Sequence, residues 1–229
     1  MPIHADFTEF QETAGADPFT LQNKKLLKVF LQYGPVKARI GSMVAYQGDA
    51  RFEHAGSGGV GGFLKQKFTG EGVPTMDVVG SGEVFLANAA AEIQIMYLEN
   101  DQIWVNGANV LAYSASLTSD IQMIGGAGAM AGGLYNVTLT GTGYVAITTD
   151  GPPVVLDVAG APTFADPQAV VMWTHGVTMN VKSDVSMKTL IGKSSGETFQ
   201  MGFSGQGWVM VQPSEGVAQG AGAKSGVGF

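Results

Sequence analysis

The 229-residue sequence predicts an all-β protein of stacked or closed β-sheets, β-helix-like or barrel-like, with internal pseudo-threefold repeats of about 60 residues each. Three observations predict this fold class. Apolar and polar residues alternate along much of the chain, glycine occurs 34 times, and one glycine-led phrase is written three times. Alternation with a period of two is typical of half-buried strands, and glycine permits the tight turns that join many short strands.

The repeated phrase is Gly-x-Gly followed by a strand-like run. It reads GSGEVFLA at 80–87, GTGYVAIT at 141–148 and GQGWVMVQ at 205–212. We expect each pair of glycines to open a strand where the backbone turns a corner or passes close to a neighbouring strand. Val84, Val145 and Val209 are expected to occupy matching positions with their side chains inward.

A second repeated phrase ends in an aromatic residue. It reads MVAY at 43–46, VLAY at 110–113 and VVMW at 170–173. Together the two phrases favour threefold internal repetition, in which apolar residues fall on apolar residues. The last Gly-x-Gly phrase begins a unit that the chain does not finish. We expect strands near the N-terminus to complete that unit, because closure removes open sheet edges.

The chain is divided into three segments by composition. Residues 1–22 are polar and are predicted to be irregular, 23–213 form a single all-β repeat domain, and 214–229 are a flexible Gly/Ala-rich tail. Helical periodicity is nearly absent. The best candidate for a helix, KKLLKVFLQ at 24–32, fits a strand equally well.

Turn-forming residues mark where strands should reverse. Asn106-Gly107 lies between two apolar runs and predicts a hairpin with a left-handed turn residue. Asp150-Gly151-Pro152 follows VAITT and predicts a second hairpin. Glu99-Asn100-Asp101 is predicted to separate two further strands, and its carboxylates are interpreted as a solvated turn rather than an acid/base pair.

The charge of the chain disfavours polyanionic partners. The formal net charge is −7, and only 12 residues are Lys or Arg. A phosphate-binding surface needs clustered basic residues, so no nucleic-acid partner is expected, and anionic membrane surfaces are disfavoured. The closest basic cluster, Lys24, Lys25 and Lys28, is interpreted as a solvated face.

The cysteine content and the hydropathy of the chain bear on the cellular compartment in which the protein is expected. The chain has no cysteine, which excludes disulfides, thiolate nucleophiles and cysteine-ligated metals and suits a reducing cytosol. No run of about 18 apolar residues predicts a transmembrane segment, although peripheral membrane association stays open. The start, MPIHADFTEF, has no features of a signal peptide, so a cytoplasmic location is expected.

The sequence offers no constellation for catalysis. His4, His54 and His175 lack the spacing of metal ligands, and isolated surface or packed histidines are favoured. The glycine runs at 56–62 and 125–133 lack the strand, helix and acidic residue of a dinucleotide site, and are interpreted as loops or close-packed turns. No G-x-S-x-G nucleophile elbow is present. We therefore predict no catalytic, cofactor-binding or metal-binding residues and no cofactor.

Aromatic and methionine residues leave two interpretations open. Aromatic residues recur at repeat positions, namely Trp104, Trp173, Trp208, Tyr46 and Tyr113. Packing in the core or between sheets is favoured over a ligand or sugar platform. Eleven methionines, among them Met123, Met130, Met172, Met179 and Met187, either fill gaps in an irregular core, the simpler account, or line an adaptable binding surface.

These residues together resemble a known family. The stretches GSMVAYQGDARFE, KFTGEG, GSGEVFLA, LTGTGYVAI and FSGQGWVMVQP are similar to the altered-inheritance-of-mitochondria family, over roughly residues 20–213. The resemblance implies stacked β-sheets with pseudo-threefold symmetry, grouped with the trp RNA-binding attenuation protein-like folds. It implies no reaction, because bacterial members have none established and the family supplies no catalytic motif.

The resemblance also bears on location. The eukaryotic member for which the family is named is linked to organisation of the inner mitochondrial membrane. This chain has no transit-like N-terminus, so the mitochondrial location is not carried over.

The sequence therefore predicts a non-catalytic scaffold or interaction protein that self-associates as a homo-oligomer and has an unknown protein partner. Its low charge should leave an exposed apolar patch, whose expected use is an oligomer with closed symmetry. The alternative is a small-molecule or glycan-binding module with an aromatic or methionine-lined face. An enzyme is the third and least favoured class.

Overall fold

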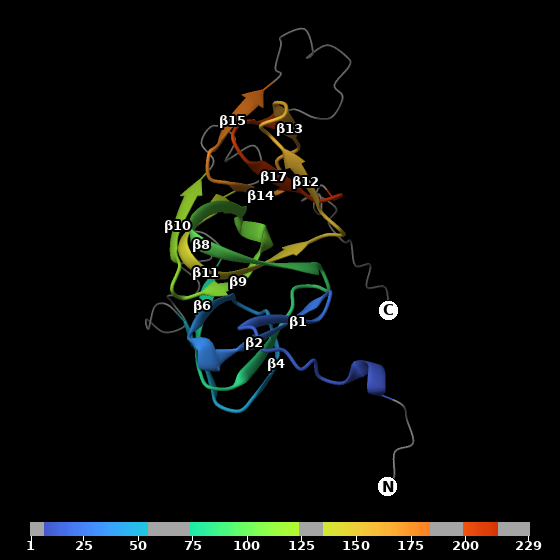
Figure 1. The fold of residues 1–229 in the computed structure, drawn as a ribbon, viewed down its shortest axis with the longest axis vertical. Coiled ribbons are helices and arrows are strands. Elements are labelled where there is room, and N and C mark those ends of the chain that lie inside the picture. The colour runs from blue at the N-terminus through green and yellow to red at the C-terminus, as the bar shows by residue number, and fades with distance from the viewer. Residues whose placement is uncertain (1–6, 55–73, 124–134, 184–198, 215–229) are drawn as a thin grey trace, which may run out of the picture. The chain divides into compact units, whose positions relative to one another are not determined.

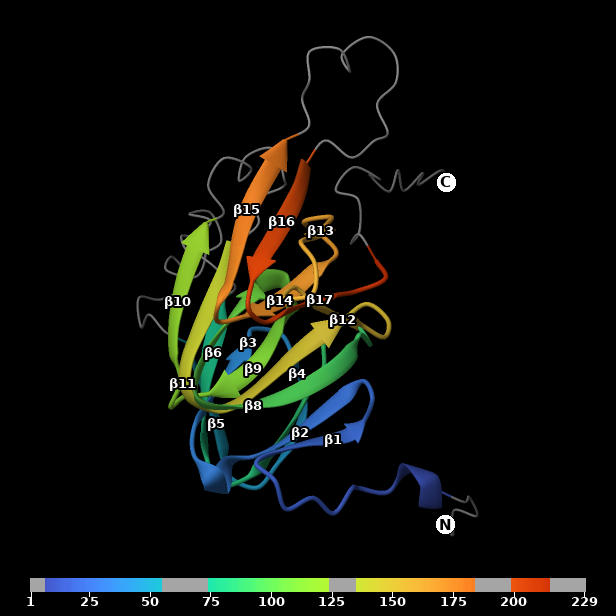
Figure 2. The same cartoon turned by 45° about the horizontal axis from the view of Figure 1, so that its top comes forward.

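The computed structural model describes residues 7–54, 74–123, 135–183 and 199–214, and Figures 1 and 2 show it from two directions. In these ranges the chain forms 17 strands and three short 3₁₀-helices, with no α-helix. Strands make up 63 % of the described residues, so the predicted all-β class is confirmed. None of the described sheets closes into a barrel, and the expectation of a closed, barrel-like structure is wrong.

The chain divides into two compact units. The first contains residues 1–101, 109–118 and 140–149, and the second contains 102–108, 119–139 and 150–229. The long strands β8 (Glu92–Asn106) and β11 (Tyr135–Thr149) give residues to both. That residues 23–213 fold as a single domain stays a prediction.

The first unit contains a four-stranded antiparallel sheet (Figure 1). Its order is β1 (Phe19–Asn23), β2 (Leu26–Phe30), β7 (Glu83–Leu86) and β4 (Met43–Gln47). A second ladder in the same unit runs β11, β9 (Val110–Ser114), β3 (Val36–Arg39), β6 (Thr75–Gly80) and β5 (Ala50–His54). A 3₁₀-helix, Thr8–Phe10, precedes them. Because β1 begins at Phe19, the irregular N-terminal segment is shorter than the predicted 1–22.

Alternating residues of β2 and β7 build the core of the first unit. Leu27 and Val29 lie opposite Leu86 and Val84 in the ladder, and all four are fully buried. The period of two therefore decides for a strand within residues 24–32. A short 3₁₀-helix, Leu31–Tyr33, follows the strand directly.

The second unit contains two further groups of strands. One ladder runs β12 (Val154–Asp157), β17 (Trp208–Val211), β14 (Val170–Thr174) and β8. The other is a three-stranded sheet of β13 (Thr163–Ala165), β16 (Phe199–Gly205) and β15 (Val177–Ser183), visible in Figure 2. Strand β10 (Thr118–Met123) pairs with β11. Val158, Trp173, Phe203 and Val209 are among the buried residues that form the core.

The last glycine-led phrase is completed by a strand other than the one expected. Strand β17 carries this phrase and lies between β12 and β14, while β1 and β2 belong to the four-stranded sheet of the first unit. The expectation that N-terminal strands complete the last phrase is therefore wrong. Strand β12 belongs to the same unit as β17 and supplies the apolar edge with which β17 pairs.

The glycine-led phrases mark corners, as predicted. Their first glycines all have left-handed backbones, with φ +137° at Gly80, +122° at Gly141 and +114° at Gly205. A Cβ at Gly80 would collide with the carbonyl oxygen of Asp49, and one at Gly205 with that of Gly176. Glycine is needed there because another turn crosses the backbone at van der Waals distance.

One of the three predicted turns has a different structure from the one expected. Residues 107–109 are a 3₁₀-helix between β8 and β9, and these strands are not paired with each other in the described ladders. The prediction of a hairpin at Asn106-Gly107 is wrong, because hydrogen bonds of the Asn106 side chain hold the turn in another conformation. Its Nδ2 donates to the Val170 carbonyl at 3.2 Å, and its Oδ1 accepts from the Ala108 N–H at 3.0 Å.

At the other two predicted turns, 150–152 and 99–101, a left-handed residue is present, but the flanking strands do not pair as a hairpin. Gly151 is left-handed at φ +83°, yet β12 pairs with β17 rather than folding back on β11. Residues 99–101 lie inside the continuous strand β8, with Asn100 left-handed at φ +51°. The Asn100 N–H donates to the Thr142 hydroxyl at 2.9 Å, which holds this irregular residue within the strand.

Candidate interaction surface

Strand β4 is an exposed apolar edge. It ends the four-stranded sheet, and β7 is its one ladder partner among the described residues. All five of its residues are exposed, including Met43 at 41 %, Val44 at 59 % and Tyr46 at 51 %. An edge strand offers unpaired N–H and C=O groups to another chain, and natural proteins commonly protect such edges with charges or prolines. Strand β4 has neither.

The equivalent phrases elsewhere in the chain are buried. In β9 the residues Val110–Tyr113 are all buried, and in β14 so are 170–173. All three strands pair with the strand of a glycine-led phrase in the same register. The aromatic residue that ends each phrase lies opposite the valine that the three glycine-led phrases share, as Tyr46 with Val84, Tyr113 with Val145 and Trp173 with Val209.

The three ladders also share an irregularity. In each one the register shifts at the second residue of the phrase, which is Val44 in β4, Leu111 in β9 and Val171 in β14. A bulge at the same place gives the three strands the same local bend. The different exposure of β4 therefore does not come from its pairing with β7.

The difference comes from the opposite edge. Strand β9 pairs there with β3, placing Tyr113 opposite Lys37. Strand β14 pairs there with β8, placing Trp173 opposite Trp104. Strand β4 has no ladder partner on this side in the ranges that the structure describes. The far edge of β4 is thus open in these ranges, whereas the corresponding edges of β9 and β14 are covered by β3 and β8.

The aromatic residues predicted to recur have separate roles. Trp173 is buried and stacks on Trp104, with ring centroids 6.1 Å apart and planes 8° apart, so the packing interpretation is right for this pair. His175 is exposed and stacks on Trp104 at 6.0 Å. Tyr46 contacts Phe52 edge-on at 5.5 Å but leaves half its surface in solvent. Tyr46 is therefore the apolar centre of the open edge.

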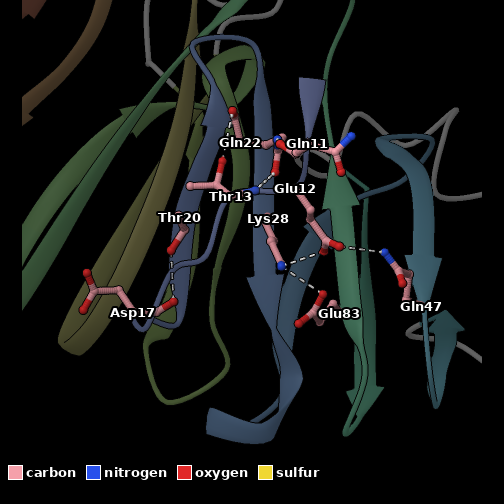
Figure 3. A network of polar contacts seen from close by, with 9 residues as sticks. All are labelled: Gln11, Glu12, Thr13, Asp17, Thr20, Gln22, Lys28, Gln47 and Glu83. Atoms are coloured by element: carbon pink, nitrogen blue, oxygen red, sulfur yellow. Dashed lines mark hydrogen bonds and ion pairs between the residues drawn. The ribbon is translucent and has the colours of Figure 1, made fainter. Parts of the chain in front are cut away.

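An ion-pair network centred on the buried Lys28 lies on the four-stranded sheet (Figure 3). The Lys28 ammonium on β2 contacts the Glu12 carboxylate at 2.7 Å and the Glu83 carboxylate of β7 at 3.0 Å. It also lies 4.5 Å from the ring centre of Phe30. Gln47, the last residue of β4, donates from Nε2 to Glu12 at 3.2 Å. The interpretation of Lys28 as part of a solvated face is wrong, because its residue is only 4 % exposed.

The network keeps both signs of charge. Burial by itself would lower the pKa of Lys28, but the hydrogen bonds it donates to Glu12 and Glu83 outweigh burial and hold the pKa above its ordinary value. The hydrogen bond from Lys28 is the main reason that the pKa of Glu12 lies below its ordinary value. Lys28 therefore stays charged, with its ammonium held by two carboxylates. It is a structural residue rather than a neutral amine suited to nucleophilic chemistry.

Side chains fasten the segment that precedes β1. Gln22 accepts from the Thr13 N–H at 2.8 Å and donates to the Gln11 carbonyl at 2.9 Å. The Tyr33 hydroxyl donates to the Ala16 carbonyl at 2.8 Å. Together with Glu12 on Lys28, these bonds anchor residues 11–16 to the first unit.

A small pocket also lies in the first unit. It has a volume of about 160 Å³ and is lined by Phe19, Phe30, Tyr33, Val36 and neighbouring residues. Pockets for small organic ligands usually measure about 300–1,000 Å³. This pocket is below that range.

The histidines and the glycine runs are the remaining candidates for metal-binding or catalytic sites. In the described part of the chain no group of three His, Asp or Glu side chains is placed to hold a metal ion. His54 ends β5, and His175 lies in the turn between β14 and β15. His4, Met130, Met187, the glycine runs at 56–62 and 125–133, and the tail from 215 onward lie outside the described residues. Met172 is buried in β14, as gap filling predicts.

The open edge of β4 is the feature that sequence reasoning missed. The phrase MVAY is a copy of VLAY and VVMW in the sequence, and nothing within the phrase itself predicts a different environment.

Comparison with known proteins places the fold. Residues 19–214 match the family model described as mitochondrial biogenesis AIM24. A crystal structure of protein SPYM3_0169 from Streptococcus pyogenes is similar, with a TM-score of 0.70 and 21 % sequence identity. The alignment covers 86 % of this chain and 92 % of that one, and at this identity it establishes the fold alone. No curated protein gives a significant match. Among the described residues, no helix has the length and apolar character needed to cross a membrane.

Proposed function

The chain belongs to the mitochondrial biogenesis AIM24 family, and on that premise we propose that it is a non-catalytic scaffold or interaction protein that self-associates through the edge of β4. One observation carries the proposal. The first copy of a three-times-repeated apolar strand is exposed along its whole length, whereas the second and third copies are buried beneath a neighbouring strand.

The energetics of the edge support association. Fully burying an aliphatic or aromatic side chain stabilises by about 1.5–3 kcal/mol, and β4 offers Met43, Val44 and Tyr46 side by side. Strand pairing adds main-chain hydrogen bonds at the same edge. The net charge of −7 keeps such a protein soluble by limiting uncontrolled aggregation.

Internal threefold repetition forms part of the same proposal. Supporting it are the common register of β4·β7, β9·β11 and β14·β17, their common bulge, and the left-handed glycine that begins each phrase. A protein built from repeats adds one strand group to the next, so its first and last groups carry uncovered edges. The grouping with trp RNA-binding attenuation protein-like folds and a cytoplasmic location stay predictions.

Light scattering with variants at the edge tests this function. Tyr46→Lys places a charge at the centre of the exposed strand, and Val155→Lys is the matched control because Val155 is equally exposed, at 53 %, on β12. We expect the wild type and Val155→Lys to form a species larger than 23.8 kDa at micromolar concentration, and Tyr46→Lys to be a monomer. A wild-type monomer at every concentration would refute self-association and return weight to a ligand-binding module.

A further inference from the structure

The small pocket of the first unit lies where the four-stranded sheet meets the ladder that contains β3 and β9. Its volume is about 160 Å³, and the residues that line it come from β1, β2, β3, β9 and the turns beside them. Phe19, Phe30 and Val36 line it with buried side chains, and Tyr33 and Pro35 line it with exposed ones. No described residue that lines the pocket is charged. The pocket is therefore suited to a neutral, mainly apolar ligand.

The walls of the pocket are held in place by contacts within the first unit. The Tyr33 hydroxyl donates to the Ala16 carbonyl at 2.8 Å, which fixes the orientation of this ring. Phe19 stacks on Tyr144, with ring centroids 5.6 Å apart. Pro35 has a φ angle restricted by its own ring. Since these groups are ordered before a ligand arrives, binding costs little conformational entropy in the protein.

One side of the pocket is free of side-chain atoms because Gly34 lines it. The backbone of Gly34 is left-handed, with φ +126°, and a Cβ built on it would meet nothing within 4 Å. A ligand therefore has room to enter beside this residue, between the buried rings and the exposed Tyr33.

The volume of the pocket fits one six-membered ring. An apolar cavity of about 150 Å³ is large enough to hold benzene, whereas sites for drug-sized ligands usually measure about 300–1,000 Å³. Flat aromatic rings pack favourably against the faces and edges of phenylalanine and tyrosine rings. The size and the aromatic lining together favour a single aromatic ring over a larger or a saturated ligand.

Two serine hydroxyls give this apolar pocket a polar side. Ser114 accepts from the Tyr144 N–H at 3.0 Å, and Ser116 donates to the Thr142 carbonyl at 2.9 Å. A hydroxyl that donates its proton in this way still has lone pairs with which to accept a hydrogen bond. Ser116 can therefore accept from an O–H group carried by the ring.

We propose that this pocket binds a small neutral molecule of the phenol class, with its ring against Phe30 and Tyr33 and its hydroxyl donating to Ser116 Oγ. A phenol has a pKa near 10 and stays neutral at pH 7, which suits a lining without charge. The site is separate from the β4 edge, because β1 and β4 lie at opposite ends of the four-stranded sheet. It therefore adds a ligand to the proposed function without depending on it.

Protein-detected NMR with the 229-residue chain tests the site. Phenol is the probe, and toluene and cyclohexanol, which have the same number of non-hydrogen atoms, are its matched comparisons. We expect phenol to shift the Val36 methyl signals and the amide signals of Gly34, Ser114 and Ser116, with a Kd on the order of 1 mM, as befits so small a ligand. Toluene lacks the hydroxyl and cyclohexanol lacks the flat ring, so each should bind roughly fivefold more weakly.

Variants separate the contact with the ring from the contact with the hydroxyl. Tyr33→Ala removes one wall and should weaken phenol binding about tenfold, whereas Tyr33→Phe keeps the ring and most of the affinity. Phe7→Ala is the matched control, because Phe7 is as exposed as Tyr33, at 55 %, and does not line the pocket. Ser116→Ala should weaken phenol binding about fivefold and leave toluene binding unchanged. Thermal unfolding of each variant confirms that it is folded.

The opposite results would overturn the assignment. Signal shifts at residues 43–47 in place of the pocket would mean that phenol binds the β4 edge. Equal affinities for phenol and toluene, or unchanged phenol binding in Ser116→Ala, would exclude the hydroxyl contact. An equal effect of Tyr33→Ala and Phe7→Ala, or the absence of saturable shifts with phenol, would mean that the pocket holds no ring. None of these results bears on self-association, which light scattering measures separately.

Discussion

Strands β4 and β14 carry the same phrase and pair with the same kind of neighbour. Tyr46 and Trp173 lie opposite Val84 and Val209, and the bulge falls at the same residue of each strand. Trp173 is nevertheless buried, whereas Tyr46 is half exposed. The neighbour on the far edge, β8 in one case and none described in the other, makes the difference. Burial of the aromatic residue that ends the phrase is therefore decided by the strand on its far edge rather than by the phrase itself.

The largest expected effect comes from truncating the two aromatic residues. Trp173→Ala removes a buried ring from the core of the second unit and should cost about 3–5 kcal/mol in the free energy of unfolding. Tyr46→Ala removes a half-exposed ring and should cost about 1 kcal/mol or less in the monomer. Urea unfolding of each single variant against the wild type, at concentrations low enough for every protein to be monomeric, measures both losses. Equal losses would mean that the two environments do not differ.

A corner glycine comes next in size. Gly80→Ala places a methyl group against the Asp49 carbonyl and forces alanine into a left-handed backbone, so we expect a loss of about 3 kcal/mol. Gly34→Ala is the control for backbone strain alone, because Gly34 has φ +126° and nothing lies within 4 Å of an added Cβ. It should cost about 1 kcal/mol. A similar loss at both positions would argue against the crossing of turns at the corner.

The Lys28 network should contribute less. Lys28→Met keeps the aliphatic packing but leaves Glu12 and Glu83 without their cation. Since both carboxylates reach solvent, we expect a loss of about 1–2 kcal/mol rather than the larger cost of a fully buried pair. Lys37→Met, which breaks the half-exposed pair with Asp77, is the control and should cost under about 1 kcal/mol. A greater loss at Lys37 would contradict this ranking.

The smallest effect is the dependence of this network on pH. The pKa of Glu12 lies below its ordinary value of 4.5, so its contribution is complete above that pH and is lost as the pH falls through the lower folded value. The pKa of Lys28 lies above 10.5, so its contribution is lost only as the pH rises beyond that. The difference in urea midpoint between wild type and Glu12→Gln should be constant from about pH 5 to 8 and vanish in acid. A difference that persists at pH 2 would exclude Glu12 ionisation as its cause.

Much of the fold follows from local patterns. Period-two alternation predicts β2, β7 and β17, and paired glycines predict the corners, because both reflect steric rules within a few residues. The partner of each strand was harder to predict. Strand β17 pairs with β12 rather than with an N-terminal strand, and Asn106 makes a 3₁₀ turn through its own side chain. These choices depend on residues more than 50 positions apart, such as Val154 and Val211 or Asn106 and Val170.

The candidate surface was predictable only in outline. Low charge and many apolar residues predict an exposed patch, but MVAY is no more apolar than VLAY or VVMW. Which of the three phrases is uncovered depends on the strand that pairs with its far edge. Lys28 is the opposite case. The residues around it in the sequence predict a solvated lysine, but it is buried, and its ammonium pairs with two carboxylates that are distant in sequence.

Amide hydrogen exchange in β4 as a function of protein concentration tests the central claim most directly. It reports on main-chain protection at the edge itself, while β9 and β14 serve as internal references in the same sample. We predict that the amides of residues 44–47 become more protected as concentration rises, whereas those of 111–113 and 171–173 stay protected throughout. Exchange in β4 that is independent of concentration, or as slow as in β14 at the lowest concentration, would contradict an edge that is open in the single chain and covered by a second copy.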